Sequence, residues 1–298
     1  MSELILTGLD GANPLGFLAA IGVVEALEAQ GFAARLAWED RGVWQPTLRG
    51  VRDADELIEV LDEDRLSCAS DSMLLFEYDG TYDLKPPPGV FRAKLKTLTR
   101  DARRDARRAV DWAAAFATDI AVDNNGNTKP TALHFTAGQQ TFLQVAREVQ
   151  AGVTPEDLRE ALFGPWRRER GLKMFGWDAT GSRDYALRAT NPSTDKKKGV
   201  PGADWLALRG LVAIPVVPRG LRIVTTGCRG EWKSERFRWP LWRAWLSRDV
   251  IRTVMRMPGL NRISSVERTA RGIAAIFECG IRRSDQGGYG SFSPAAVI

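Results

Sequence analysis

Positive charge is concentrated in one stretch of the sequence, residues 92–108. Eight of its 17 residues are basic, namely Arg92, Lys94, Lys96, Arg100, Arg103, Arg104, Arg107 and Arg108, and only Asp101 and Asp105 oppose them. Apolar residues recur at helical spacing from Leu95 to Ala109, so the basic side chains must project from the other faces of a helix. Such a helix can lie along a phosphate backbone and displace its counterions. The alternative is a solvated helix whose aspartates pair with nearby arginines.

A second basic segment, residues 165–178, interleaves cations with aromatic side chains. Arg167, Arg168, Arg170 and Lys173 are mixed with Trp166, Phe175 and Trp177. This composition is suited to stacking bases while the cations hold phosphates. The alternative is that the aromatic side chains belong to the core and only the cations reach water.

Two further basic groups lie near loop-forming residues. The additional binding residues predicted there are Lys196, Lys197, Lys198, Arg282 and Arg283. The lysines fall in segment 176–204, whose Gly, Ser, Asp and Pro content predicts a long exposed loop that could close over a polyanion. The arginines precede a Gly-rich tail that could cradle a phosphate. A plain exposed loop is the alternative for the lysine segment.

Enzymatic signatures are mostly absent from the sequence. His134 is the only histidine, and the chain contains neither a Cys-x-x-Cys pair nor a P-loop. We therefore predict no catalytic residue, no metal site and no cofactor. His134 follows a polar loop at a strand-to-helix junction, where it could act as a lone general base. A half-buried histidine whose ring bonds a backbone carbonyl is the favoured interpretation.

Composition and charge narrow the class of protein. The 298 residues are 44% hydrophobic and 27% charged, which is ordinary globular composition, and 42 Lys+Arg against 37 Asp+Glu give a net charge of +5. Three widely spaced cysteines favour a reducing compartment. No apolar run is long enough to span a membrane, and the N-terminus lacks the pattern of a secretion signal. These features predict a cytoplasmic protein without a membrane partner.

The predicted elements place these segments in a mixed architecture. Helices are expected at Pro14–Ala29 (with Asn13 as N-cap), 54–61, 91–116 and 137–150, and another from the capping box at Thr154. Strands are expected at 4–6, 34–38, 44–48, 211–217 and 221–225, with a Pro-rich break at 85–90. Core packing best explains Trp239, Trp242 and Trp245, whose spacing would put them near one helical face. The pattern predicts an α+β fold, a mixed sheet with packed helices, as one large domain or as two lobes of residues 1–150 and 151–298.

Several phrases of the sequence resemble one known family. Residues 8–27, with Asn13-Pro-Leu followed by Ala-Ala-Ile-Gly-Val-Val, resemble the opening of CRISPR-associated proteins of subtype I-G (formerly I-U). Residues 131–143, 202–218 and 221–227, and the Trp-Pro-Leu-Trp phrase at 239–242, are similar to phrases of the same proteins. They occur in order over most of the chain, and none is a catalytic motif.

The resemblance implies a subunit of a multi-protein, RNA-guided antiviral complex, related to its large subunit. Its partners would be guide RNA, target DNA and other effector subunits. The chain is shorter than most large subunits, so a reduced version or an accessory subunit also fits. From the residues and the resemblance together, we expect a non-catalytic nucleic-acid-binding subunit. A metal-independent nuclease using His134 and a protein-interaction scaffold are the alternatives.

Overall fold

The N-terminal segment folds into a helix and a small antiparallel sheet. The computed structural model describes residues 2–100, 104–137, 140–181, 198–220, 222–231, 234–257, 259–260, 263–284 and 289–298. β1 (Leu4–Ile5), β2 (Arg35–Asp40) and β3 (Trp44–Arg49) pair in the order β1-β3-β2, with α1 (Pro14–Ala29) between β1 and β2 in the chain. The bounds of α1 are those predicted, because the Asn13 side chain accepts a hydrogen bond from the Leu15 N–H and Pro14 stands in the first turn.

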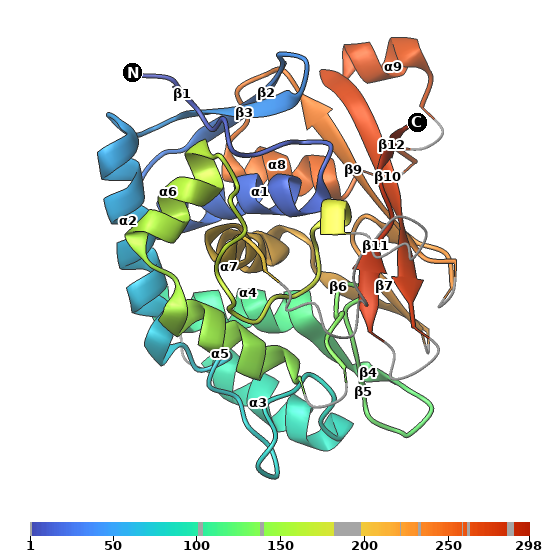
Figure 1. Cartoon of the computed structure of the whole chain (residues 1–298). Helices are drawn as coiled ribbons and strands as arrows, with labels where there is room; N and C mark the ends of the chain where they lie inside the picture. Colours follow the sequence, from blue (N-terminus) through green and yellow to red (C-terminus); the bar gives the residue numbers. More distant parts are fainter. Residues whose placement is uncertain are drawn as a thin grey trace, which may run out of the picture.

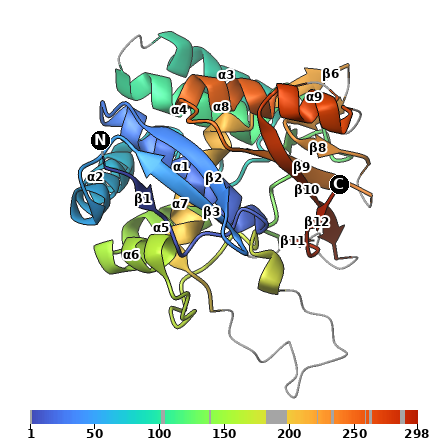
Figure 2. The ribbon, with the colours of Figure 1, turned by 90° about the horizontal axis from the view of Figure 1, so that it is seen from above.

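The basic segment is not one helix, and this prediction is wrong. α3 (Pro88–Arg100) and α4 (Arg104–Phe116) are separate helices that run side by side (Figures 1 and 2). Both helices contribute to the same core, α3 through Phe91 and α4 through Trp112. A single helix over the 26 predicted residues would be about 39 Å long and would carry these two aromatic side chains apart. Pro88, which lies in the Pro-rich break predicted at 85–90, is the first residue of α3.

Other helices and a hairpin complete this half of the chain. They are α2 (Ala54–Ser67), β4 (Ala117–Val122), β5 (Thr128–Pro130), α5 (Phe142–Gly152) and α6 (Pro155–Phe163). The capping box that was predicted at Thr154 is present, since Thr154 and Asp157 bond each other's backbone N–H. α2 continues past the predicted end at residue 61, and α5 begins later than predicted.

The C-terminal half is built on a longer sheet. Its elements are α7 (Pro201–Gly210), β6 (Val216–Arg219), β7 (Arg222–Thr225), β8 (Cys228–Arg229), β9 (Arg236–Trp242), α8 (Arg248–Met255), α9 (Ser265–Ala270), β10 (Ile273–Arg283), β11 (Gly290–Phe292) and β12 (Ala296–Val297). The sheet order is β11-β10-β9-β8, with β12 also paired to β10, and β6 and β7 form a hairpin of their own. An isolated bridge between Leu36 and Leu246 links the chain after β9 to β2.

Three local predictions in this half are corrected. Pro201 to Asp204, assigned to a loop, are the buried first turn of α7. Leu211–Ala213, assigned to a strand, is a short 3-10 helix that continues α7. Trp239 and Trp242 lie on strand β9 and are buried, as core packing requires, but they share no helical face. Both faces of β9 are buried from Trp239 to Trp242, so the residues there do not alternate as they do in a half-exposed strand.

The predicted α+β class is confirmed. The sheets are several, and every strand pair in the described ranges is antiparallel. Residues from both predicted lobes share one hydrophobic core that extends from Leu6 to Phe292. No helix in the described ranges is both long and apolar enough to cross a lipid bilayer.

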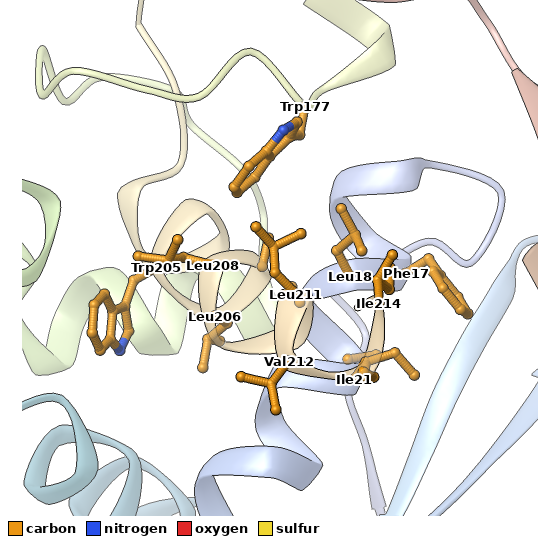
Figure 3. Close-up of a cluster of buried hydrophobic side chains, with 14 of the residues drawn as sticks. Phe17, Leu18, Ile21, Trp177, Trp205, Leu206, Leu208, Leu211, Val212 and Ile214 are labelled. Carbon is orange, nitrogen blue, oxygen red and sulfur yellow. The ribbon is translucent and has the colours of Figure 1, made fainter. Parts of the chain in front are cut away.

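The centre of this core is the contact between α1 and α7. A Cβ atom placed on Gly22 of α1 would lie 1.7 Å from the Leu206 carbonyl oxygen, and one placed on Gly210 of α7 would lie 2.1 Å from that of Leu18. The two backbones therefore touch, and only glycine fits at either position. Around this contact, Figure 3 shows Phe17, Leu18 and Ile21 beside side chains of α7 and the 3-10 helix after it.

Two ion pairs attach further helices to this helix pair. Arg209 of α7 donates two hydrogen bonds to Asp64 of α2, at 2.7 and 3.0 Å, and both side chains are almost fully buried. Arg252 of α8 donates two, each of 2.7 Å, to Glu25 of α1. Breaking a buried pair by removing one partner costs about 3–5 kcal/mol, so these contacts fix α2 and α8 against the core.

We predict that Gly22→Ala lowers the free energy of unfolding by about 3 kcal/mol or more, because the new methyl group forces α1 and α7 apart. Gly89→Ala is the matched control. Gly89 lies in α3 with open space around its Cβ position, so helix propensity should leave the protein unchanged or up to about 1 kcal/mol more stable. Urea unfolding of both variants measures this, and a Gly22→Ala protein as stable as the wild type would contradict the proposed contact.

Candidate nucleic-acid interface

An open cleft of about 1070 Å3 lies beside the β6–β7 hairpin. The hairpin and residues 226–231 form one side. Lys129 and Pro130 of β5, with residues 131–136 that follow, form another. The end of α8, with Arg256, Met257, Gly259 and Leu260, closes the cleft. Because these segments are far apart in the sequence, only the tertiary fold assembles the cleft.

Cations dominate the lining of this cleft. The basic residues are Lys85, Lys129, Arg219, Arg222, Arg229, Arg238, Arg256 and Arg283, and the acidic residues are Asp123, Glu231 and Glu235. The excess of five positive charges is as large as the net charge of the whole chain. A concave surface lined by one sign of charge focuses its potential on a bound ion of the opposite sign. The cleft is therefore suited to a polyanion.

Several of these cations have no acidic partner among the residues that the structure describes. Arg222 pairs with Glu231 at 3.1 Å, Arg283 with Glu235 at 3.3 Å, and the Arg238 Nε donates to Glu278 at 2.9 Å. Within the described ranges, no ion pair is formed by Lys85, Lys129, Arg219 or Arg256. Their charge is available to an external anion.

Arg283 holds the floor of the cleft in place. Its guanidinium donates hydrogen bonds to the carbonyl oxygens of His134, at 2.8 Å, and Ala132, at 2.6 Å. The side chain is only 5% exposed, so this predicted binding residue supports the site from below. The neighbouring Arg282 is exposed on β10 but does not line the cleft.

His134 also lies at the cleft, where a carboxylate holds its ring. The Nε2 atom lies 3.0 Å from Asp83 Oδ1, and the same oxygen accepts from the N–H of Phe142, the first residue of α5. The ring is stacked on Phe142 with centroids 5.6 Å apart. The backbone-carbonyl partner expected from the sequence is thus replaced by Asp83. The pair ties the chain before α3 to the start of α5.

Burial sets the charge state of this pair. Loss of hydration lowers the pKa of His134, against the hydrogen bond and the charge of Asp83, and the cations of Lys85 and Arg283 act in the same direction as burial. Burial alone would raise the pKa of Asp83, but the hydrogen bond from His134 and backbone N–H groups leave it lowered. His134 is therefore a neutral donor to an ionised Asp83 at pH 7.

In the 92–108 segment, the predicted cations whose side chains the structure describes lie outside the lining of this cleft. Arg92 pairs with Asp119 at 2.7 Å and Arg107 with Asp111 at 2.9 Å. Arg108, which bonds Asp71 and Ser67, attaches α4 to the end of α2. Lys94 is half-buried near the Phe76 ring, and burial lowers its pKa.

The other predicted cations of this segment and those of the predicted lysine loop are either exposed or lie wholly or partly outside the described residues. Lys96 and Arg100 are exposed on α3. Arg104 is described only as the first residue of α4, and Arg103 lies outside the described residues, as do Lys196 and Lys197 of the predicted loop. Lys198 is described and exposed.

The Arg/Trp segment is largely engaged in internal contacts. Phe175 and Trp177 are buried and stacked on each other with centroids 4.3 Å apart, so neither can stack on a base. Arg168 pairs with Asp178 at 3.1 Å and Lys173 with Glu148 at 2.7 Å. Arg170 donates to the Gly152 carbonyl at 2.9 Å and lies 3.5 Å from Asp157. Arg167 remains exposed.

Sequence inspection missed most of the cleft. The missed cations are Lys85, Lys129, Arg219, Arg222, Arg229, Arg238 and Arg256. They lie singly or in pairs along the chain, so no sequence window shows their combined charge. The one available signal was the predicted hairpin around Pro218-Arg-Gly, with arginines on both sides of its turn.

Comparison with known proteins identifies no family for this chain. No protein-family model and no curated protein sequence matches this chain. Within the described ranges, no group of three or more His, Cys, Asp or Glu side chains is arranged to hold a metal ion.

We predict that acidification destabilises the wild type more than His134→Gln. The pKa of His134 is lowered on folding, so below about pH 6.5 the unfolded chain binds a proton that the folded chain does not. Stability that is present at pH 7 is then lost as the pH falls. Glutamine can donate an N–H to Asp83 but does not titrate, so the stability gap between the proteins should change by about 1 kcal/mol from pH 7.5 to 5.5. Urea unfolding of both proteins across this pH range measures the gap. If their free energies of unfolding change equally with pH, His134 is not a neutral, buried histidine.

Proposed function

We propose that this protein is a nucleic-acid-binding subunit of an RNA-guided CRISPR effector complex and that it holds a polynucleotide backbone in the basic cleft. The observation that carries the proposal is the lining of the cleft, with eight cations against three acids. Phosphate contacts from such cations release condensed counterions and supply affinity that does not depend on base sequence.

The effector context rests on the resemblance to subtype I-G proteins. It supports guide RNA and target DNA as the nucleic acids and other effector subunits as protein partners. The phrases that carry it include the start of α1, the α7 region and β9, which are core elements of the fold. They support a shared architecture and assign no role to any residue of the cleft.

We propose no catalytic role for His134. Its ring is stacked on Phe142, its Nε2 is engaged by Asp83, and the side chain is 6% exposed. A general base must reach the proton that it abstracts, and these contacts favour a structural role. A His134→Gln protein should therefore bind nucleic acid as the wild type does. If the wild type cleaves labelled RNA or DNA in the presence of a chelator and this variant does not, the nuclease alternative is correct.

We predict that replacing three unpaired cleft cations weakens the dependence of binding on salt. Each phosphate neutralised contributes roughly 0.7–0.9 to the slope of log affinity against log salt, so a triple Lys85→Ala, Lys129→Ala, Arg256→Ala variant should flatten the slope by about 2–3 units. The measurement is fluorescence anisotropy with labelled oligonucleotides across a salt series.

The control is a triple variant on the basic helices, Lys96→Ala, Arg100→Ala and Arg107→Ala. It removes the same charge from outside the cleft, and we expect its slope to match the wild type. If the control flattens the slope and the cleft variant does not, the helices predicted from the sequence are the binding surface. If the wild type binds no oligonucleotide even at low salt, the interaction-scaffold alternative replaces the proposal.

A further inference from the structure

The β6–β7 hairpin presents one exposed face to the cleft. Its register places Arg219 opposite Arg222 and Val217 opposite Val224. Directly opposite residues of an antiparallel pair, and residues two apart on a strand, share a face. These four side chains therefore lie together, and all four are exposed and line the cleft. In Figure 2, β6 lies at the edge of the molecule.

The two arginines at the end of this hairpin are in an unfavourable arrangement. Side chains directly opposite each other start from Cβ atoms about 4.5–5.5 Å apart, and like charges there destabilise the strand pair. Arg222 has an acidic neighbour, Glu231, at 3.1 Å, but both side chains of that pair are 79% exposed. An ion pair so exposed contributes little. Arg219 forms no ion pair within the described ranges.

We propose that Arg219 and Arg222 clamp one phosphate group between them. A phosphate oxygen set between two guanidinium groups replaces their repulsion with charge-assisted hydrogen bonds, for which the planar fork of arginine is suited. In the polynucleotide that the proposed function places in the cleft, on which this inference rests, the group is a backbone phosphate. Val217 and Val224 then offer an apolar surface to the adjoining sugar. The clamped phosphate stabilises the hairpin, because it binds the paired strands and not the separated ones.

This arrangement predicts that Arg222→Glu has opposite effects on stability and binding. A glutamate opposite Arg219 turns a repulsive cross-strand pair into an attractive one. It also removes the pair with Glu231, but both side chains there are 79% exposed, so solvent screens the two carboxylates from each other and the loss is small. Hydrogen exchange of the β6 and β7 amides in the unliganded protein should therefore slow by about two- to fivefold. The same change removes one side of the clamp, and affinity for a single-stranded oligonucleotide should fall by about 10- to 100-fold. Replacing a surface arginine without this role is not expected both to slow exchange of the hairpin amides and to weaken oligonucleotide binding.

Two further variants make the comparison specific. Arg222→Gln removes the repulsion without adding an acid, so its exchange rate and affinity should lie between those of the wild type and Arg222→Glu. Arg41→Glu makes the same charge change in the turn between β2 and β3, where Arg41 pairs with Glu39 outside the cleft. Because solvent ions screen distant exposed charges, its affinity should stay within about twofold of the wild type.

Inorganic phosphate and the oligonucleotide are tested separately on the wild type. Both should slow exchange of the β6 and β7 amides, and neither should do so in Arg222→Glu. If phosphate protects the hairpin but no oligonucleotide binds, the clamp stands, its ligand is a free phosphate compound and the proposed function fails. If the oligonucleotide binds but Arg222→Glu loses no more affinity than Arg41→Glu, the clamp is wrong and the proposed function is untouched. Faster hairpin exchange in unliganded Arg222→Glu also overturns the clamp.

Discussion

The close approach of α1 and α7 is the constraint on which the rest of the structure depends. Gly22 and Gly210 let the two backbones touch, and the elements that border the cleft extend from this helix pair. α7 leads through the short 3-10 helix directly into β6. α1 holds α8 through the pair Glu25–Arg252, and α8 ends beside Arg256. Arg219 on β6 and Arg256 after α8 lie on separate borders of the cleft. The position of both therefore depends on the contact between α1 and α7.

Electrostatics divides the charged residues into two groups. Arginines such as Arg209, Arg252 and Arg283 are buried or half-buried and donate hydrogen bonds to carboxylates or backbone carbonyls. Their charge is therefore paired or solvated within the fold. Lys129 and Arg219 lie in the cleft without an acidic partner in the described ranges. In the open cleft these cations are solvated by water and counterions, so their charge remains available to an anion that enters it. A basic composition alone would not distinguish these groups.

Local signals predicted the elements whose ends depend on nearby residues. The Asn13-Pro14 start of α1 and the capping box at Thr154 depend on bonds within a few residues, and both were found where expected. The single basic helix failed because Phe91 and Trp112 must both reach one core, which its apolar stripe does not reveal. The apolar run at the end of β9 was misassigned because both faces of the strand are buried from Trp239 to Trp242, which removes the alternation that marks a half-exposed strand.

The sequence by itself determined the α+β class, the ends of the best-capped helices and the excess of basic residues, since each follows from composition or from contacts along the chain. It showed the densest charge in residues 92–108, where several cations prove to be paired with nearby aspartates. Tertiary structure alone decided where unpaired positive charge gathers. Lys85, Lys129, Arg219 and Arg256 meet in one cleft because the helix packing brings distant segments together, and electrostatic potential adds up over distance in space, whatever the separation along the chain.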